Sequence, residues 1–171
     1  MTLLYGGDIR MYRTFCGADG NNAYLLGGLC PWLTLESIII DAPLHPEGVL
    51  GDTRDTTVMA VLITHQYEDH WEGLPAIKAH TGAPVGMHER DIAGVPFSPD
   101  FTVDDDAVVH ADSIKLRIFH TSGHTLGSVC FWFPGIFLPE IPCTREAQEK
   151  AGPRRYDGDT REYHPETLHA S

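Results

Sequence analysis

The sequence contains few basic residues. Its 171 residues include 12 Lys and Arg against 24 Asp and Glu, which gives a formal net charge of −12 at pH 7. Proteins that bind nucleic acids without sequence preference neutralise phosphates with clustered Lys and Arg. We therefore expect no nucleic-acid partner, and we interpret the acidic charge as a feature that favours solubility.

Cysteine is also scarce, and long apolar runs are missing. Cys16, Cys30, Cys130 and Cys143 form no Cys-x-x-Cys pair, so nothing suggests a disulfide framework and a reduced cytoplasmic protein is expected. No apolar stretch approaches the roughly 20 residues of a membrane span, so we expect no membrane association. Residues 1–8 lack the basic start and long apolar core of a signal peptide.

Histidine, in contrast, is frequent: the chain has ten. Histidines in such number are a reason to search for metal ligands. The length suits one compact domain and is short for two, so residues 1–171 are predicted to form a single domain. Proline and charge become dense after residue 135, and residues 136–171 are expected to form a divergent, poorly ordered tail.

Short segments rich in strand-forming residues predict a chain made mainly of strands. The clearest strand is the apolar run at residues 57–63. A helix is expected from about residue 71 to 80, closed by Gly82. The other predicted strands cover residues 9–15, 22–26, 37–41, 83–87, 101–103, 107–109, 114–120 and 128–133, and residues 44–56 are expected to form a loop or a short helix.

The predicted strand at 57–63 runs directly into a loop that holds His65, Asp69 and His70. A tight loop at the carboxyl end of a buried strand can direct several side chains at one point. Imidazole and carboxylate are ligands that suit zinc, iron and manganese. His124 lies on a second glycine-containing loop that also follows a strand, so the two loops could converge on one metal site.

Both loops resemble signatures of the metallo-β-lactamase superfamily. Residues 64–70, Thr-His-Gln-Tyr-Glu-Asp-His, resemble its His-x-His-x-Asp-His motif, and residues 122–128, Ser-Gly-His-Thr-Leu-Gly-Ser, resemble its Pro-Gly-His-Thr-x-Gly-Ser loop. Residues 21–26 and 38–43 are similar to the family's early strands, and the segments occur in the family's order. The short loops are more similar to the hydroxyacylglutathione hydrolase (glyoxalase II-like) branch than to nucleic-acid processing members.

The resemblance implies an α/β fold, α+β in some schemes, namely the metallo-β-lactamase αββα sandwich, here with an incomplete second half. It implies one or two zinc ions, with iron or manganese as alternatives. Bound metals would lower the pKa of a water molecule and polarise the group under attack, and Asp69 would hold that water or accept its proton. The implied ligands are His65, Tyr67 and His124 for one metal, Asp69 and His70 for the other, and Asp159 as a bridge.

Tyr67 departs from this pattern, because the family has its second histidine there. A neutral phenol, with a reference pKa near 10, is a poor zinc ligand. Three interpretations are open: Tyr67 binds iron as a phenolate, it hydrogen-bonds a water that completes a weaker first site, or it marks a site that has lost activity.

The second departure concerns the bridging aspartate. The family has it in a Gly-Asp pair at the end of the strand after the second loop, and no such pair stands there. The later pair Gly158-Asp159 would require an insertion. His164 and His169 are interpreted as residues of a polar tail.

The leading hypothesis is a metal-dependent hydrolase that acts on a small thioester, ester or lactam through a metal-activated water. One alternative is a catalytically degenerate metal-binding member of the fold, and another is an iron-dependent oxygenase or redox member. A partial core would leave apolar surface exposed, which would favour a homo-oligomer. Outside the ligand set, His120 is expected to end a strand in a structural role, Cys130 to be a core residue, and Trp71 to pack or to floor a substrate pocket.

Overall fold

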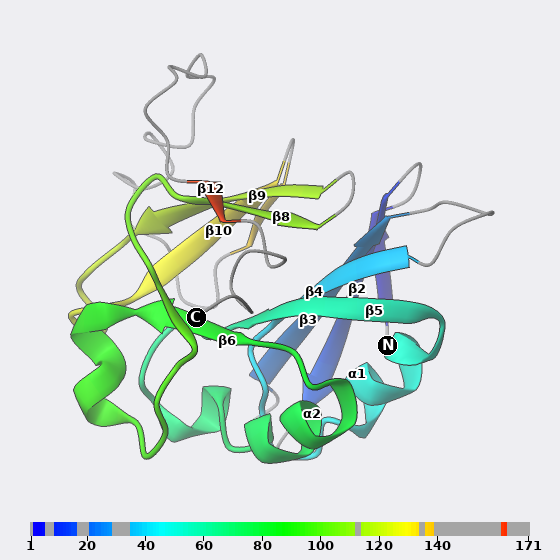
Figure 1. Cartoon of the computed structure of the whole chain (residues 1–171), viewed down its shortest axis with the longest axis horizontal. Helices are drawn as coiled ribbons and strands as arrows, with labels where there is room; N and C mark the ends of the chain where they lie inside the picture. The colour runs from blue at the N-terminus through cyan, green and yellow to red at the C-terminus, as the bar shows by residue number, and fades with distance from the viewer. Residues whose placement is uncertain are drawn as a thin grey trace.

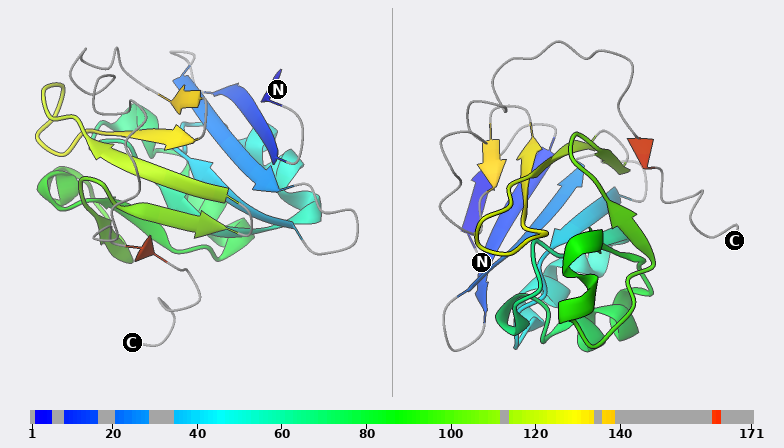
Figure 2. Two further views of the ribbon diagram at one scale, coloured as in Figure 1. Left: turned by 90° about the horizontal axis from the view of Figure 1, so that it is seen from above. Right: turned by 90° about the vertical axis from the view of Figure 1, so that its left-hand side faces the viewer.

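The computed structural model describes residues 2–5, 9–16, 21–28, 35–111, 114–133, 136–138 and 162–163. Two β-sheets lie face to face, and the helices cover the outer side of the larger sheet (Figures 1 and 2). The order of layers is therefore helix, sheet, sheet, which agrees with the α/β class predicted from the sequence.

The larger sheet has seven strands in sequence order. Its first four strands pair antiparallel, and its last four pair parallel. Carboxyl ends of parallel strands meet at one edge of a sheet, so loops that follow them lie close together. The strands are β1 (Thr2–Tyr5), β2 (Ile9–Cys16), β3 (Asn21–Gly28), β4 (Leu35–Ile40), β5 (Thr56–Leu62), β6 (Val85–His88) and β7 (Phe101–Val103).

The helices connect the parallel strands. Residues 71–73, expected to be helical, form a turn, and the helix that follows spans Leu74–Thr81. Gly82, with a φ of 66°, terminates this helix as predicted. Pro75 fits the first turn because that position needs no amide donor. The helical segments are α1 (Glu47–Asp52), α2 (Leu74–Thr81) and the 3-10 helices η1 (Thr53–Asp55), η2 (Glu68–His70) and η3 (Glu89–Gly94).

The smaller sheet has five strands in the order β11-β10-β9-β8-β12. Neighbours pair antiparallel, except that β12 lies parallel to β8. The strands are β8 (Val108–Ala111), β9 (Ile114–His120), β10 (Val129–Phe133), β11 (Ile136–Leu138) and β12 (Glu162–Tyr163). Two short parts of the predicted tail thus join this sheet, whereas Asp159, His164 and His169 lie outside the described residues.

The larger sheet buries both of its faces. Ile38 and Ile40 on β4 pack into the core between the sheets, and Ile39 between them packs against the helical side. All three are fully buried. Because successive side chains of a strand point to opposite faces, a continuous apolar run is what a strand covered on both sides needs.

One face of the smaller sheet packs against the larger sheet. Ile114, Leu116 and Ile118 on β9 are fully buried between the sheets, whereas Lys115 and Arg117 point away and are exposed or half-buried. Within the described ranges no helix covers this outer face, so three layers of the expected αββα sandwich are seen.

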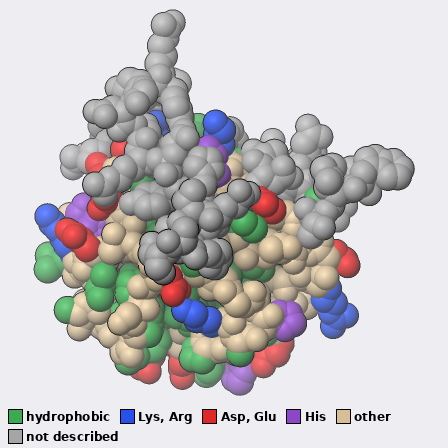
Figure 3. Space-filling model, viewed as in Figure 1, with side chains coloured by type: hydrophobic (Ala, Val, Ile, Leu, Met, Phe, Trp, Pro, Cys, Tyr) green, Lys and Arg blue, Asp and Glu red, His purple; other side chains and the backbone are tan. Residues whose placement is uncertain are grey.

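Few basic side chains are visible on one face of the molecule. On the face drawn in Figure 3, Lys and Arg side chains are few and separated, with Asp and Glu side chains between them. No helix in the described segments has the length and hydropathy needed to cross a lipid bilayer.

Candidate metal centre

Two loops meet at the carboxyl edge of the parallel strands. One follows β5 and carries His65, and the other joins β9 to β10 and carries His124. The amide of Val129 donates to the carbonyl oxygen of Thr64 at 3.0 Å, which links the start of β10 to the first loop. The convergence predicted from the sequence is therefore present in the fold.

Asp41 holds the first loop in place through hydrogen bonds. It follows β4, has a left-handed backbone (φ 58°) and is fully buried; aspartate and asparagine tolerate this conformation better than most residues. Its carboxylate accepts hydrogen bonds from the Thr64 amide at 2.8 Å, the Thr64 hydroxyl at 2.8 Å and His70 Nδ1 at 2.9 Å. One carboxylate thus holds the backbone of the loop and one of its histidines.

These hydrogen bonds determine which ring nitrogen of His65 carries a proton. The Thr64 hydroxyl donates its only hydrogen to Asp41, so it acts as the acceptor in its 2.9 Å contact with His65 Nδ1. Nδ1 of His65 must therefore be protonated, and Nε2 carries a lone pair. His70 in turn donates from Nδ1 to Asp41.

His65 is a buried base with an unsatisfied nitrogen. Its side chain is 1 % exposed, and its Nε2 has no hydrogen-bond partner among the described residues. Burial lowers the pKa of His65 to about 3, and repulsion from His70 and His124 adds to the effect, against the opposing influence of Asp69. At neutral pH the ring is neutral. A buried nitrogen acceptor with no partner is costly in a folded protein, and a neutral imidazole of this kind is the form that binds metals.

The other aromatic side chains of the predicted site surround His65. The ring centroids of His70 and His124 lie 4.1 and 4.8 Å from that of His65. The Tyr67 ring lies 5.1 Å from His65 and 4.7 Å from His124, edge-on to both, and its side chain is 44 % exposed. Tyr67 therefore occupies the mouth of the site, next to the two histidines expected to share its metal.

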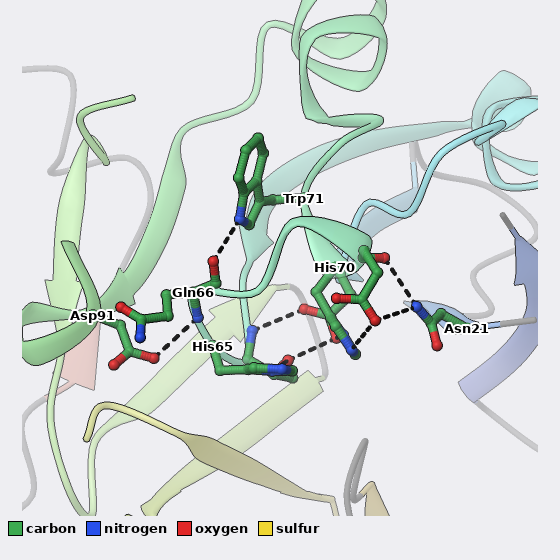
Figure 4. A network of polar contacts seen from close by, with 9 residues as sticks. Asn21, His65, Gln66, His70, Trp71 and Asp91 are labelled. Atoms are coloured by element: carbon green, nitrogen blue, oxygen red, sulfur yellow. Dashed lines mark hydrogen bonds and ion pairs between the residues drawn. The ribbon is translucent and has the colours of Figure 1, made fainter. Parts of the chain in front are cut away.

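Asp69 lies next to His70. Asn21 at the start of β3 donates from Nδ2 to Asp69 Oδ2 at 2.7 Å and to its carbonyl oxygen at 3.2 Å. The same carboxylate oxygen is 3.6 Å from His70 Nε2, and the side chain is 44 % exposed. Figure 4 shows Asn21 and His70 facing each other across this carboxylate. Asp69 thus has one side fixed and one side open to solvent.

The donor set fits a metal ion in its chemistry. It offers three imidazoles and a carboxylate, and the tautomer of His65 leaves the Nε2 lone pair for coordination. In the described part of the chain, no three His, Cys, Asp or Glu side chains already stand as a complete ligand set; the rings of His65, His70 and His124 contact one another instead. Asp159, the predicted bridging ligand, lies outside the described residues.

Several supporting residues have little signal in the sequence. Thr64, Asn21 and Asp91 contact the site loops through hydrogen bonds that depend on folding. Asp91 lies three residues after β6, at the same sheet edge, and this position is the only signal that could have singled it out. Asp41 had a stronger signal, because it ends an apolar strand that precedes the histidine loop.

The residues assigned structural roles have such contacts. His120 ends β9 as predicted, and its Nε2 donates to the carbonyl oxygen of Leu126 at 2.8 Å. Cys130 is buried in β10, as predicted for a core residue. Trp71 packs edge-on against Phe97 and donates from Nε1 to the carbonyl oxygen of Gln66 at 2.8 Å, so it packs and tightens the loop (Figure 4).

The sequence is similar to those of hydroxyacylglutathione hydrolases. The chain is 38% identical over 123 residues to hydroxyacylglutathione hydrolase of Methylobacterium nodulans, covering 71% of this chain and 46% of that protein. It is 36% identical over 85 residues to the hydroxyacylglutathione hydrolase of Methylobacterium sp. (strain 4-46), covering 50% of this chain and 32% of that protein. No protein-family model matches.

Among solved structures, the fold is similar to the BLEG-1 B3 metallo-beta-lactamase, with a TM-score of 0.62 and 20% identity over 72% of this chain and 67% of that one. The chain has the metallo-β-lactamase fold, and the resemblance predicted from its sequence is confirmed. ETHE1 from Myxococcus xanthus is another structural neighbour, with a TM-score of 0.59 and 20% identity over 72% of this chain and 53% of that one. Within the superfamily, the sequence is similar to the hydroxyacylglutathione hydrolase branch, and the chain spans less than half the length of the curated relatives it matches.

Proposed function

We propose that this protein is a metal-dependent hydrolase, with the metal held between the loop after β5 and the loop between β9 and β10. The observation that carries the proposal is Nε2 of His65, a fully buried nitrogen acceptor without a partner among the described residues. Its tautomer is fixed by the chain from Asp41 through Thr64. Such a carboxylate-supported imidazole is typical of a metal ligand rather than of a core histidine.

We assign the ligands His65, Asp69, His70 and His124 to this centre, and zinc is the metal that suits them best. When bound, the metal supplies Lewis acidity and makes water a nucleophile at neutral pH. Tyr67 contributes an exposed phenol at the mouth, where it can donate a hydrogen bond to a water or a substrate.

Asp69 is the proposed proton acceptor. Asn21 fixes one carboxylate oxygen at 2.7 Å, while the side chain stays 44 % exposed. The carboxylate is therefore oriented without being sealed from solvent, so it can take a proton from a water that approaches the site.

The substrate class proposed is a small thioester, ester or lactam. Its basis is similarity to hydroxyacylglutathione hydrolases, together with the exposed apolar surface of Tyr67 and Leu126 on the two site loops. The specific observation favouring the alternative, a degenerate metal-binding member, is Tyr67 itself, which places a weak donor between two histidines.

Metal analysis with a substrate panel tests the proposal. The full chain is purified with zinc and assayed with a thioester, an ester and a chromogenic lactam. We expect bound zinc and hydrolysis of at least one substrate in the wild type, and loss of both in His65→Ala. His80→Ala, an exposed histidine on α2, is the matched control and should change neither.

Tyr67→His separates the two functions. If the wild type is an active enzyme, it hydrolyses a substrate before the change, and Tyr67→His only raises its zinc affinity. If the wild type binds less than one zinc per chain and hydrolyses nothing, while Tyr67→His gains both properties, the degenerate alternative replaces the proposal. Unchanged metal content in His65→Ala would refute the metal centre itself.

A further inference from the structure

A second buried carboxylate, Asp91, joins the two loops of the site. It lies on η3 and is 1 % exposed. Its Oδ2 accepts from the Gln66 amide at 3.0 Å and from the Thr125 hydroxyl at 2.5 Å, and its Oδ1 accepts from the Gly127 amide at 2.7 Å. One donor belongs to the loop of His65 and two belong to the loop of His124 (Figure 4 shows the Gln66 contact).

The hydroxyl network around Asp91 leaves Thr125 a single arrangement. Thr125 donates its only hydrogen to Asp91, so it is the acceptor in its 2.7 Å contact with Ser128 Oγ. The Ser128 hydroxyl in turn accepts from the Thr125 amide at 3.0 Å. Every hydroxyl hydrogen is thereby assigned, and the backbone that directly follows His124 is fixed.

The packing around Asp91 is as tight as the hydrogen bonding. A Cβ atom at Gly127 would lie 2.7 Å from Asp91 Cγ and 2.9 Å from its amide nitrogen. Real Cβ atoms essentially never approach other atoms so closely, so only glycine lets this loop approach η3. The Asp91 carboxylate and the lack of a side chain at Gly127 together determine the distance between the two loops.

His124 depends on this placement more than His65 does. The His124 side chain is exposed, and its ring contacts are with His65 and Tyr67. His65, in contrast, is buried and held through Thr64 and Asp41. The position of the His124 ring therefore depends mainly on its backbone. Asp91 fixes that backbone through its hydrogen bond with the next residue, Thr125.

We propose that Asp91 is a positioning residue that sets the spacing between His65 and His124 and thereby the metal affinity of the site. The inference rests on the proposed metal centre, and it assigns Asp91 no contact with metal or substrate. Asparagine in its place would present an NH₂ group to donors that need an acceptor, so the clamp between the loops would open.

Cobalt(II) titration of the full chain, followed by visible absorption, tests this role. We expect Asp91→Asn to lower cobalt affinity by about 10-fold, the low end for residues that support ligands, and to alter the ligand-field spectrum. The matched control is Asp100→Asn, because that carboxylate also clamps the fold, by accepting from the Val85 amide at 2.8 Å and from Lys78 Nζ at 2.7 Å, away from both loops. It should leave cobalt affinity and spectrum unchanged.

A double variant shows whether Asp91 acts through His124. In a His124→Ala background, Asp91→Asn should cause no further loss of cobalt affinity, because the ligand it positions is gone. An equal loss in both backgrounds, or unchanged affinity and spectrum in the single variant, would overturn the inference. If Asp91→Asn fails to fold, Thr125→Val removes one hydrogen bond of the clamp and should give a smaller loss in the same direction.

Failure of the proposed function gives a different result. Wild type that binds no cobalt would refute the metal centre and the inference with it. Wild type that binds cobalt through His65, with Asp91→Asn indistinguishable from it, would refute the positioning role alone.

Discussion

Asp41 and Asp91 are both buried carboxylates at the same sheet edge, and each accepts three hydrogen bonds. The groups that donate to them differ. Asp41 contacts the His70 ring directly and the His65 ring through the Thr64 hydroxyl. Asp91 contacts two amides and a hydroxyl of the loops and no histidine. The first carboxylate controls where the ring protons lie, and the second controls how far apart the loops lie.

This difference separates ligand chemistry from ligand spacing. Loss of Asp41 should damage each histidine of the first loop and leave the second loop in place. Loss of the contact at Asp91 should leave the protonation of His65 and His70 intact and move His124. The two carboxylates can therefore be tested separately, by variants that disturb one arrangement at a time.

The largest effect is expected from Asp41→Asn. Asparagine keeps the left-handed backbone but has one acceptor oxygen for three donors, so at least one buried donor loses its partner. We expect the free energy of unfolding of the metal-free protein to fall by about 3 kcal/mol, the upper range for a buried unsatisfied group. Urea denaturation measures the loss, and zinc affinity should fall about 10- to 100-fold.

Asp55→Asn, at an exposed position of η1, is the control for Asp41→Asn, because it removes the same charge from the surface. Equal stability of the two variants would show that Asp41 is not the centre of the buried network.

An intermediate effect is expected from Gly127→Ala, which forces the second loop away from Asp91. Overpacking of this kind costs about 1–3 kcal/mol, and the added displacement should weaken zinc binding without changing the histidines of the first loop. Thermal denaturation and zinc titration measure both effects. Gly51→Ala on α1 is the control: its Cβ meets nothing within 4 Å, so it should leave zinc binding unchanged and raise stability slightly. Undiminished zinc affinity in Gly127→Ala would contradict the spacing argument.

The smallest expected effect is a pH dependence of stability that arises at His88, next to the 3-10 helix η3 that carries Asp91. His88 is buried, stacks on His120 at a centroid distance of 4.1 Å, and caps η3 by accepting from the Arg90 amide at 3.2 Å. Burial lowers the pKa of His88, and His120 and Arg90 lower it further, against Asp104 and Glu89, which raise it.

Because the folded state disfavours protonated His88, the unfolded chain binds more protons once the pH falls below the ordinary histidine pKa of about 6.5. The stability contributed by neutral His88 is therefore full above that pH and is lost as the pH falls below it. His88→Asn keeps a capping oxygen and cannot titrate, so its unfolding free energy should fall less steeply than that of wild type between roughly pH 6.5 and 5. His80→Asn, at an exposed site, should follow wild type; a His88→Asn curve parallel to wild type would exclude His88 as a source of the pH dependence.

The sequence was informative where chemistry is local. The histidine loop follows the most apolar strand of the chain, so the position of His65, Asp69 and His70 at a sheet edge could be predicted from hydrophobicity and spacing alone. Gly82 likewise predicted the end of α2, since a left-handed terminus favours glycine.

The rest depended on contacts between distant segments. Asp91 and Thr125 are 34 positions apart, and Asn21 and Asp69 are 48 apart; neither pair has a spacing pattern that a sequence displays. The start of α2 was predicted three residues early, because hydrophobic periodicity cannot separate a helix from the 3-10 turn and the following turn that tie residues 68–73 to Ala42. Asp159 lies outside the described residues, so its bridging role stays a prediction.

The central claim is that histidines from both loops bind one metal ion, and proton NMR of the cobalt(II)-substituted full chain tests it most directly. Ring protons of a histidine bound to cobalt(II) shift far outside the usual spectral range. We predict such signals from His65, His70 and His124 together, each lost in the corresponding alanine variant, with the Nδ1 protons of His65 and His70 slow to exchange because they are buried. Shifted signals from the histidines of one loop only, or from none, would contradict a metal centre shared by the two loops.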